Sequence, residues 1–395
     1  MAASQVQPSP EKNLLLVGGG HSHVTVLKEL GLKPISGVRL TVVSREVLTP
    51  YSGMLPGLVA GHYQFHETHI DLGPLAEFAG AQLFHDEVLR LDLAAKRAFL
   101  KTNAPLDYDV LSIDIGSTPD MTEVPGAAET AVPVKPISNF MERWEKLQAR
   151  VLAAKGAVRI GVVGAGAGGV ELTLAIQYAL QQLKEAKEAK EGKGLHLEFH
   201  LFSATEILPT HNAKVRAKFR RVLAEREVIV HAGSPVEEVG SGWLRLKSGN
   251  KFPLEEILWV TQARAAPWLK EAGLATDARG FVQVADTLES VSHPGVFAAG
   301  DVAAMVNHPR EKAGVFAVRQ GKPLEENLRR ALRGEPLQPF IPQTKFLGLI
   351  STGDRYAIAS RGNWSLEGGY VWTIKDWIDR RFMEKYKIGH RGTEK

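Results

Sequence analysis

Three glycines between two apolar runs are the first residues whose spacing indicates a chemistry. They are Gly164, Gly166 and Gly169, which follow residues 158–163 and precede residues 172–180. In this G-x-G-x-x-G spacing one glycine permits a tight turn, one lets the backbone approach a pyrophosphate, and one lets the helix pack closely on the strand. The N-terminus of the helix then offers free N–H groups and partial positive charge to the phosphates. The strand before and the helix after favour a dinucleotide site over a turn that only tightens a loop.

A second unit of this kind lies near the N-terminus, but its third glycine is replaced. Residues 13–17 are expected to form a strand that runs into Gly18 and Gly20, and His23 stands at the third position. The imidazole of His23 would hold the following helix, residues 24–30, off the strand or turn toward a phosphate. We interpret this unit as a second dinucleotide turn.

The acidic residue that usually binds a ribose at the end of the next strand is missing from both units. Residues 38–43 end at Ser44, with Glu46 as a displaced candidate, and residues 197–202 end at Ser203. Two basic residues beyond the second strand either meet a 2′-phosphate or lie on a helix surface: Lys214 and Arg216. The choice between NADH and NADPH therefore stays open.

The composition is that of a soluble globular chain. At 395 residues, with 44% hydrophobic and 23% charged residues, two or three domains are expected. A net charge of +4, without a basic stripe interleaved with aromatics, argues against nucleic acid. The chain has no cysteine, which excludes disulfides, zinc–thiolate sites and a catalytic thiol. Residues 1–12 are expected to be a disordered lead-in without a signal sequence, and we expect a cytoplasmic protein.

Two more segments have residue types suited to a bound ligand. Residues 49–57 interleave small and apolar residues, as against a flat aromatic ligand or as in a packed connector. Residues 293–301 form a strand that closes on Gly300 and Asp301. An acid at this place can hydrogen-bond a polyol beside a phosphate, or it can simply cap a helix. Three histidines lie at spacings that could ligate a metal on a helix, but without accompanying acids we expect no metal site: His62, His66 and His69.

The remaining pattern predicts elements that connect these units. Hairpin-like strands are expected at 89–100 and 106–115, helices at 140–154 and 312–332, the latter broken at Pro323, and two strands at 346–350 and 356–360. The charged run 181–194 is expected to extend a helix into solvent.

The tail, residues 370–387, is expected to be an amphipathic helix. Val371, Ile374, Ile378 and Phe382 would form one apolar stripe, beside several basic residues. Such a helix either docks on the protein's own core or lies in a membrane interface.

Taken together, two strand–glycine–helix units and a late strand ending in Gly-Asp resemble the two-dinucleotide-binding-domain flavoproteins of the pyridine nucleotide–disulfide oxidoreductase superfamily. At closer range GGGHSHV, PYSGMLPG, DIGSTP, VPVKP, HPGVFAAGD, KAGVFAVRQG and STGDRYAIASRG resemble the branch often fused ahead of selenide, water dikinase. Type II NADH:quinone dehydrogenases are related to that branch. The resemblance implies an α/β fold of two Rossmann-like domains with a C-terminal α+β segment. The expected boundaries are an FAD domain at 13–125 and 285–340, an NAD(P) domain at 126–284, and a C-terminal segment at 341–395.

The resemblance also assigns roles by position. Facing FAD would be the following residues: Gly18, Gly20, Ser22 and His23 at the pyrophosphate, Ser44 or Arg45 at the adenosine ribose, Pro50, Tyr51 and Ser52 at the isoalloxazine, Gly116 and Ser117 at the domain crossover, Gly300 and Asp301 at the ribityl chain, and Lys312, Ala313 and Gly314 at a helix start. Contacting NAD(P)H would be these: Gly164, Gly166, Gly169, Ser203 and Gln262. Glu171 and Lys135 would act near the flavin and nicotinamide.

The chain departs from the superfamily in having no CxxxxC pair, so disulfide reduction is excluded. Gln262 also replaces the glycine usual in the second crossover motif. We therefore expect an FAD-dependent NAD(P)H oxidoreductase that passes electrons to a small acceptor, a quinone first of all. The alternatives are a flavin-binding redox partner of selenophosphate synthesis and a reductase of a selenium or sulfur species. Peripheral contact with the inner membrane face is an expectation tied to the tail helix.

Overall fold

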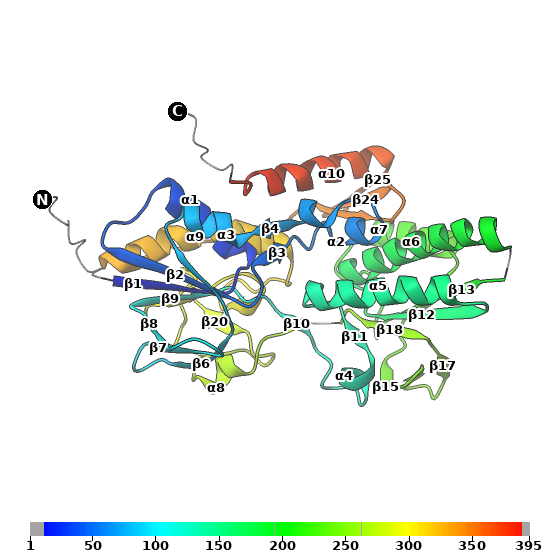
Figure 1. Ribbon diagram of the computed structural model, residues 1–395, viewed down its shortest axis with the longest axis horizontal. Helices are drawn as coiled ribbons and strands as arrows, with labels where there is room; N and C mark the ends of the chain where they lie inside the picture. Colours follow the sequence, from blue (N-terminus) through cyan, green and yellow to red (C-terminus); the bar gives the residue numbers. More distant parts are fainter. Residues whose placement is uncertain (1–11, 193, 262, 389–395) are drawn as a thin grey trace, which may run out of the picture.

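The computed structural model describes residues 12–192, 194–261 and 263–388. The chain builds two parallel five-stranded sheets that lie side by side (Figure 1). The first has the order β21-β9-β1-β2-β5, with these bounds: β21 Val296–Ala298, β9 Val110–Ile113, β1 Lys12–Val17, β2 Val38–Ser44 and β5 Gln82–His85. The second has the order β11-β18-β12-β13-β14, with these bounds: β11 Val132–Pro133, β18 Glu256–Trp259, β12 Ala157–Val163, β13 His196–Phe202 and β14 Val228–His231.

Helices cover both sheets, which explains why their central strands are almost continuously apolar. The longer helices are α1 His21–Leu32, α3 Leu72–Phe78, α5 Ile137–Ala153, α6 Ala167–Glu191, α7 Ala213–Glu225 and α9 Gly314–Arg333. Helices α1 and α9 pack on each other over the first sheet. Helix α6 continues through the charged run to Glu191, which confirms the expected extension. Pro323 lies inside α9 without ending it, so the expected break is wrong.

Smaller sheets complete the two halves. They are β6-β7-β8 (Val88–Asp92, Arg97–Leu100, Leu106–Asp107), β15-β16-β17 (Val236–Gly240, Trp243–Leu246, Lys251–Pro253), β3-β4 (Leu48–Pro50, His69–Asp71), β20-β22 (Val282–Val284, Ala303–Met305) and β10-β19 (Thr118–Pro119, Ala263–Arg264). The short helices are α2 Leu55–Val59, α4 Ala127–Thr130, α8 Trp268–Glu271, η1 Phe65–Glu67 and η2 Gly300–Val302. The expected hairpin 89–100/106–115 is only partly right, because β9 leaves it to join the parallel sheet between β1 and β21.

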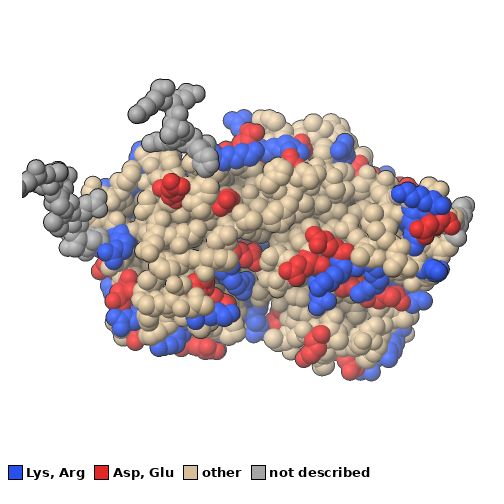
Figure 2. Space-filling view, viewed as in Figure 1, with Lys and Arg blue, Asp and Glu red and all other residues tan. Residues whose placement is uncertain are grey.

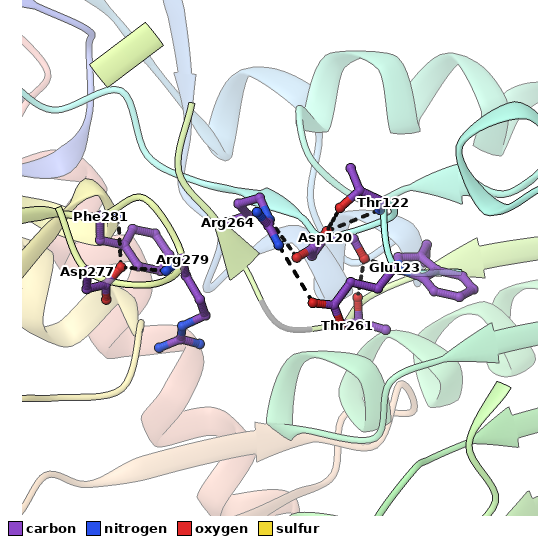
Figure 3. Close-up of polar contacts among 9 residues, drawn as sticks. Asp120, Thr122, Glu123, Thr261, Arg264, Asp277, Arg279 and Phe281 are labelled. Carbon is purple, nitrogen blue, oxygen red and sulfur yellow. Dashed lines mark hydrogen bonds and ion pairs between the residues drawn. The ribbon is translucent and has the colours of Figure 1, made fainter. Parts of the chain in front are cut away.

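The chain passes between the two halves through the antiparallel pair β10-β19. Arg264 on β19 places its Nε 2.6 Å from the Asp120 carboxylate and a terminal nitrogen 3.7 Å from Glu123 (Figure 3). Thr261, which lies between β18 and β19, donates to the Asp120 carbonyl. The apolar residues that follow, including Leu269 and Phe281, pack in the core of the first half. Residues on both sides of the boundary expected at 284/285 thus belong to one hydrophobic core.

The C-terminal segment joins both halves. A three-stranded antiparallel sheet, β23 Gly348–Ser351, β24 Ala357–Arg361 and β25 Trp364–Gly368, packs against α6 and α7, and α10 Gly369–Glu384 follows it. In Figure 1 α10 lies across the top of the molecule.

Helix α10 does not present the single apolar stripe expected from sequence. Val371 and Phe382 are buried, whereas Ile374 and Ile378 are exposed. The buried face is shared with a lysine and an aspartate, Lys375 and Asp379. No helix in the described part of the chain is long and apolar enough to cross a membrane.

Candidate functional site

Three of the expected cofactor glycines surround one residue, Asp114. Asp114 follows β9 and is 2% exposed. A Cβ on Gly18 would lie 2.3 Å from the Asp114 carbonyl oxygen, and Cβ atoms on Gly20 and Gly300 would lie 2.2 and 2.4 Å from its Oδ1. Since real Cβ atoms do not approach oxygen so closely, all three positions require glycine. Asp114 is part of the DIGSTP motif, but the sequence indicates no role for it. The glycines that surround it come from remote parts of the chain, so their proximity cannot be recognised from the sequence.

A second cluster forms around Asp301 at η2. Its Oδ2 accepts hydrogen bonds from Lys135 Nζ at 2.8 Å and from Ser117 Oγ at 3.2 Å. Burial acts to raise the pKa of Asp301, but Lys135 and the hydrogen bonds outweigh it and the pKa is lowered. The N–H of Gly300 donates to Gln320 Oε1 at 2.6 Å. The structure thus brings together Lys135, Ser117 and Asp301, which the sequence placed near one ligand.

His21, which the sequence did not single out, faces the same region. Its ring meets Tyr51 edge-on at 5.5 Å between centroids, and Phe382 of α10 at 5.9 Å. Its Nε2 is buried and has no hydrogen-bond partner. Burial lowers the pKa of His21 to about 4, the charge of Asp301 opposes this shift, and the charge of Lys135 adds to it. His21 is therefore a neutral imidazole with one nitrogen free for a ligand.

The side chains of Ser22 and His23 bond within the protein, so the His23 imidazole is not turned toward a phosphate. The Ser22 hydroxyl donates to the Ala317 carbonyl at 2.7 Å. The His23 ring forms hydrogen bonds with the Gly18 carbonyl and Ser112 Oγ at 2.7 and 2.8 Å. The imidazole therefore lies inside the fold, at the position where the motif usually has its third glycine. The physical reason is that both residues are completely buried between α1 and the sheet.

At the expected ribose position the side chains are engaged locally. Ser44 Oγ donates to the Glu46 carbonyl at 2.6 Å. The Glu46 carboxylate accepts from Ser138 of α5, and Arg45 is exposed beside Glu87. The geometry therefore does not distinguish Ser44 from Arg45 as a ribose contact.

The remaining flavin-side residues lie around the start of α9. Ala313 is the N-cap and Gly314 the first helical residue, with Ser52 Oγ 3.6 Å from the place of a Gly314 Cβ. Lys312 lies over the Phe281 ring, and burial lowers its pKa to about 8. Pro50 ends β3, and Gly116 follows Asp114 with a φ of +72° and open space at its Cβ position.

In the second half the glycines of the turn at β12–α6 divide into two kinds. A Cβ on Gly164 would lie 2.5 Å from the Val260 carbonyl oxygen, and one on Gly169 would lie 1.8 Å from the Gly164 carbonyl oxygen. Gly166 has nothing within 4 Å. Gly164 and Gly169 are thus required by packing, and Gly166 leaves space at the helix N-terminus for a ligand. Ser203 is buried at the end of β13, and Gln262 lies outside the described residues.

Glu171 connects the nucleotide turn to the C-terminal helix. Its Oε1 accepts the Ser351 N–H at 2.8 Å. Burial raises the pKa of Glu171, and the nearby charge of Lys375 opposes that rise.

Lys375 continues this connection to the flavin-side loop. Its Nζ donates to the Gly53 carbonyl at 2.6 Å and to Asp379 Oδ2 at 2.7 Å, and Tyr51 donates to Asp379 at 3.2 Å. Burial acts to lower the pKa of Lys375, but the charges of Glu171 and Asp379 raise it, so the amine stays an ammonium. The sequence missed Lys375 and Asp379, although their i, i+4 spacing was a signal for a pair.

The three histidines 62, 66 and 69 do not assemble with acids. His62 bonds the Gly353 carbonyl and His69 the Phe65 carbonyl. Among the described residues no group of three or more His, Asp or Glu could hold a metal ion.

These features fit two dinucleotides. The buried, unpaired Nε2 of His21 and the Asp301–Lys135–Ser117 cluster suit the polar part of a flavin dinucleotide, and the open space at Gly166 suits a second pyrophosphate. Fold and site together define a flavoprotein with two dinucleotide-binding domains.

Residues 12–321 match the family model for pyridine nucleotide-disulphide oxidoreductases, and the chain belongs to this family. Its cofactors are accordingly FAD and NAD(P)H. A relative is the NADH dehydrogenase-like protein Rv1812c of Mycobacterium tuberculosis, 26% identical over 257 residues, which are 65% of this chain and 63% of that protein. The chain thus matches less than two thirds of that relative's length.

Two other similarities extend over nearly the whole chain. The type II NADH:quinone oxidoreductase of Haemophilus influenzae is 22% identical, covering 89% of this chain and 87% of that one. Among solved structures, the sulfide:quinone oxidoreductase of Aquifex aeolicus superposes with a TM-score of 0.78 at 18% identity, covering 95% of this chain and 91% of that one. This structural similarity supports the fold.

Proposed function

We propose that the chain takes hydride from NAD(P)H and passes the electrons through FAD to a small acceptor, a quinone. The observation that carries the proposal is the polar chain Glu171–Lys375–Asp379–Tyr51, which runs from the nucleotide turn to the flavin-side loop. The name of the Haemophilus relative supports a quinone as the acceptor class. FAD supplies the two-electron redox chemistry when it is bound, and the chain has no cysteine to supply it instead.

The protein's own residues bind, orient and exchange protons in this scheme. Gly166 and the N-terminus of α6 hold the NAD(P)H pyrophosphate. Asp301 and His21 hold the polar part of FAD, and Lys135 keeps Asp301 ionised. Lys312 and the N-terminus of α9 place positive charge where reduction increases negative charge. Glu171 delivers a proton to the reduced acceptor, and the Lys375 ammonium acts on Glu171 through its charge. The other expected cofactor residues, where their side chains form no bond within the protein, remain candidate contacts to FAD or NAD(P)H.

We also propose domain limits that follow the observed cores. An FAD domain comprises residues 13–119 and 265–340, an NAD(P) domain comprises 120–264, and the C-terminal segment comprises 341–395. The differences from the sequence-based limits lie in residues 120–125, of which Met121 and Val124 pack with the second half, and in residues 265–284, several of which pack in the first core.

The deciding experiment is an anaerobic titration of the FAD-loaded protein with NADH and with NADPH, followed by short-chain quinones, oxygen and selenium or sulfur species. We expect bleaching by a nicotinamide and recovery of the yellow colour with quinones at the highest rate. Failure to bleach with either nicotinamide would overturn the proposal. Turnover with a selenium or sulfur species but not with quinones would favour the second class of acceptor.

Contact with a membrane surface is proposed from the outer face of α10. Tyr370, Ile374, Trp377 and Ile378 are 38–58% exposed and lie at helical spacing on that face. Figure 2 shows Lys and Arg side chains along α10, with some Asp and Glu side chains among them. Aromatic and apolar residues beside cations suit an anionic bilayer surface.

Vesicle flotation tests that contact. The protein is expected to float with vesicles containing anionic lipid, and a variant with Ile374→Glu and Trp377→Glu should not. Because both side chains are exposed, the variant should keep its melting temperature within a few degrees. Equal flotation of the two proteins would refute the contact.

A functional link to selenide, water dikinase is proposed on the motif resemblance. Co-migration of the two purified proteins in gel filtration would support it, and separate elution at micromolar concentration would count against it.

A further inference from the structure

The carboxyl group of Asp114 occupies the N-terminus of α1. Its Oδ2 accepts the N–H groups of Ser22 and His23 at 2.8 and 3.0 Å. Its backbone carbonyl accepts the N–H of Gly20 at 3.0 Å. In a glycine turn these amides normally face a pyrophosphate. The first turn of α1 has therefore directed three of its donors at one residue of the protein.

The other oxygen of this carboxyl lies close to two of the expected cofactor glycines, Gly20 and Gly300. Asp114 Oδ1 is the atom that leaves no room for a Cβ at either Gly20 or Gly300. Gly300 is followed by Asp301 of η2. A bound pyrophosphate at α1 and the Asp301 carboxylate would thus both adjoin Asp114.

The groups that face Asp114 provide little compensating charge. His21 and His23 from α1 are neutral, because burial lowers the pKa of each to about 4. Gln320 from α9 is uncharged and bonds the Gly300 N–H. Lys135 contacts the Asp301 carboxylate, and Lys312 acts electrostatically on the same group. Asp114 itself forms no ion pair among the described residues.

We propose that Asp114 couples flavin binding to proton uptake: its carboxyl must carry a proton for the FAD pyrophosphate to share the N-terminus of α1. This inference rests on the FAD site proposed above. The uncharged carboxyl keeps Oδ2 as the acceptor for Ser22 and His23, and its hydroxyl at Oδ1 becomes a donor toward the ligand. The ionised carboxyl instead places a third negative group beside the pyrophosphate and Asp301.

The free protein is poised for this coupling near neutral pH. Burial raises the pKa of Asp114 to about 7, the N–H groups of His23 and Ser22 oppose the rise, and Asp301 adds to it. A nearby pyrophosphate raises the pKa further, since like charge favours the protonated form. FAD affinity is therefore expected to be flat below pH 7 and to fall above it.

The test is the FAD dissociation constant of the deflavinated full-length protein, measured by flavin fluorescence between pH 6 and 9. For one linked proton the constant should rise about tenfold per pH unit above the pKa of free Asp114. In Asp114→Asn, which keeps an amide oxygen for the two N–H groups, the constant should be independent of pH. Asp86→Asn is the control, because Asp86 is also a buried carboxylate bonded to backbone N–H groups, in the loop after β5 rather than at α1, and its variant should keep the slope.

Calorimetry of the unaltered protein provides a second readout if Asp114→Asn does not fold. At pH 8, FAD binding in buffers of different ionisation enthalpy should reveal uptake of close to one proton. Binding of FAD with no proton uptake, or an unchanged pH slope in Asp114→Asn, would overturn the role of Asp114 and leave the proposed function intact. A protein that binds no FAD at any pH would refute both.

Discussion

Gly166 and Gly169 belong to the same turn, but the first leaves space for a ligand and the second is required by packing. Alanine substitutions can therefore distinguish the two roles. A methyl group on Gly166 meets no protein atom, and its φ of −68° suits alanine. It would, however, fill the space left for the nucleotide. Gly166→Ala is therefore expected to fold normally and to raise the KM for NAD(P)H by tenfold or more.

Gly169→Ala is expected to destabilise the fold instead, by about 1–3 kcal/mol, because its Cβ would overlap the Gly164 carbonyl. Gly168 is the control, since its Cβ position is open and helical. Gly168→Ala should leave KM unchanged and raise stability by up to about 1 kcal/mol. Thermal unfolding of the three variants measures their stability, and nicotinamide titration measures their KM for NAD(P)H. A normal KM in Gly166→Ala would contradict the role of Gly166 at the nucleotide.

Glu171 is expected to affect acceptor reduction more than flavin reduction. Glu171→Gln keeps an oxygen for the Ser351 N–H but cannot release a proton. Stopped-flow measurements should show unchanged bleaching by NAD(P)H and reoxidation by quinone slowed by about 10²-fold or more. Glu185→Gln, on the exposed part of α6, should match the unaltered protein in both phases. Equal reoxidation rates in Glu171→Gln would remove Glu171 from the proton path.

At the residue scale, the sequence revealed what is local and missed what is assembled. The turn at Gly164 could be predicted because its spacing, strand and helix are contiguous. Asp114 could not, since the groups that define its surroundings come from residues 18–23 and from residue 300. Lys375 likewise contacts the carbonyl of a residue 322 positions earlier in the chain.

The buried face of α10 joins its helix to the rest of the molecule through charge. Lys375 is 7% exposed, and removing its ammonium would leave Asp379 and Glu171 without a cation. Lys375→Met is therefore expected to lower the free energy of unfolding by about 3–5 kcal/mol. Arg380→Met on the same helix breaks partly exposed pairs with Asp376 and Glu67 and should cost about 1 kcal/mol or less. Urea unfolding measures the free energy of unfolding of both variants. Equal losses in the two variants would show that the burial of an ion pair does not determine how much it stabilises the protein.

Helices and strands were predicted well where the apolar residues followed a single helical or strand periodicity. Strands β1, β2, β12 and β13 and helices α5 and α6 agree with the expected positions within a few residues, whereas β5, β11 and β14 were not predicted. The α10 stripe was wrong because Ile374 and Ile378 resemble core residues by type, while the core positions are shared with a charged pair. Hydrophobic periodicity cannot recognise a buried ion pair, because it counts lysine and aspartate as surface.

For the whole molecule, buried histidines predict a loss of stability in acid. Burial lowers the pKa of His21 and His23 from 6.5 to about 4, so the unfolded chain binds more protons than the folded one between these values. Their contribution is complete above pH 6.5 and is lost as pH falls toward 4, by up to about 3 kcal/mol per histidine.

Asp114 acts in the opposite direction, since its raised pKa gives a contribution that is lost as pH rises through 7. The measurement is therefore a comparison of slopes. Between pH 6.5 and 4.5 the stability of His23→Gln should fall less steeply than that of the unaltered protein. If the two proteins lose stability equally with falling pH, protonation of His23 does not lower the free energy of unfolding.

The two nucleotide-binding halves are fastened at opposite edges. On one edge lie the paired crossings β10 and β19, and on the other the C-terminal segment reaches from α6 and α7 to the loop at Tyr51 (Figure 1). A body held along both edges cannot swing open about either, so the distance from nicotinamide to flavin is set when the polypeptide folds. Catalysis in such a frame is expected to run without domain closure, and solution scattering profiles with and without nicotinamide should superimpose.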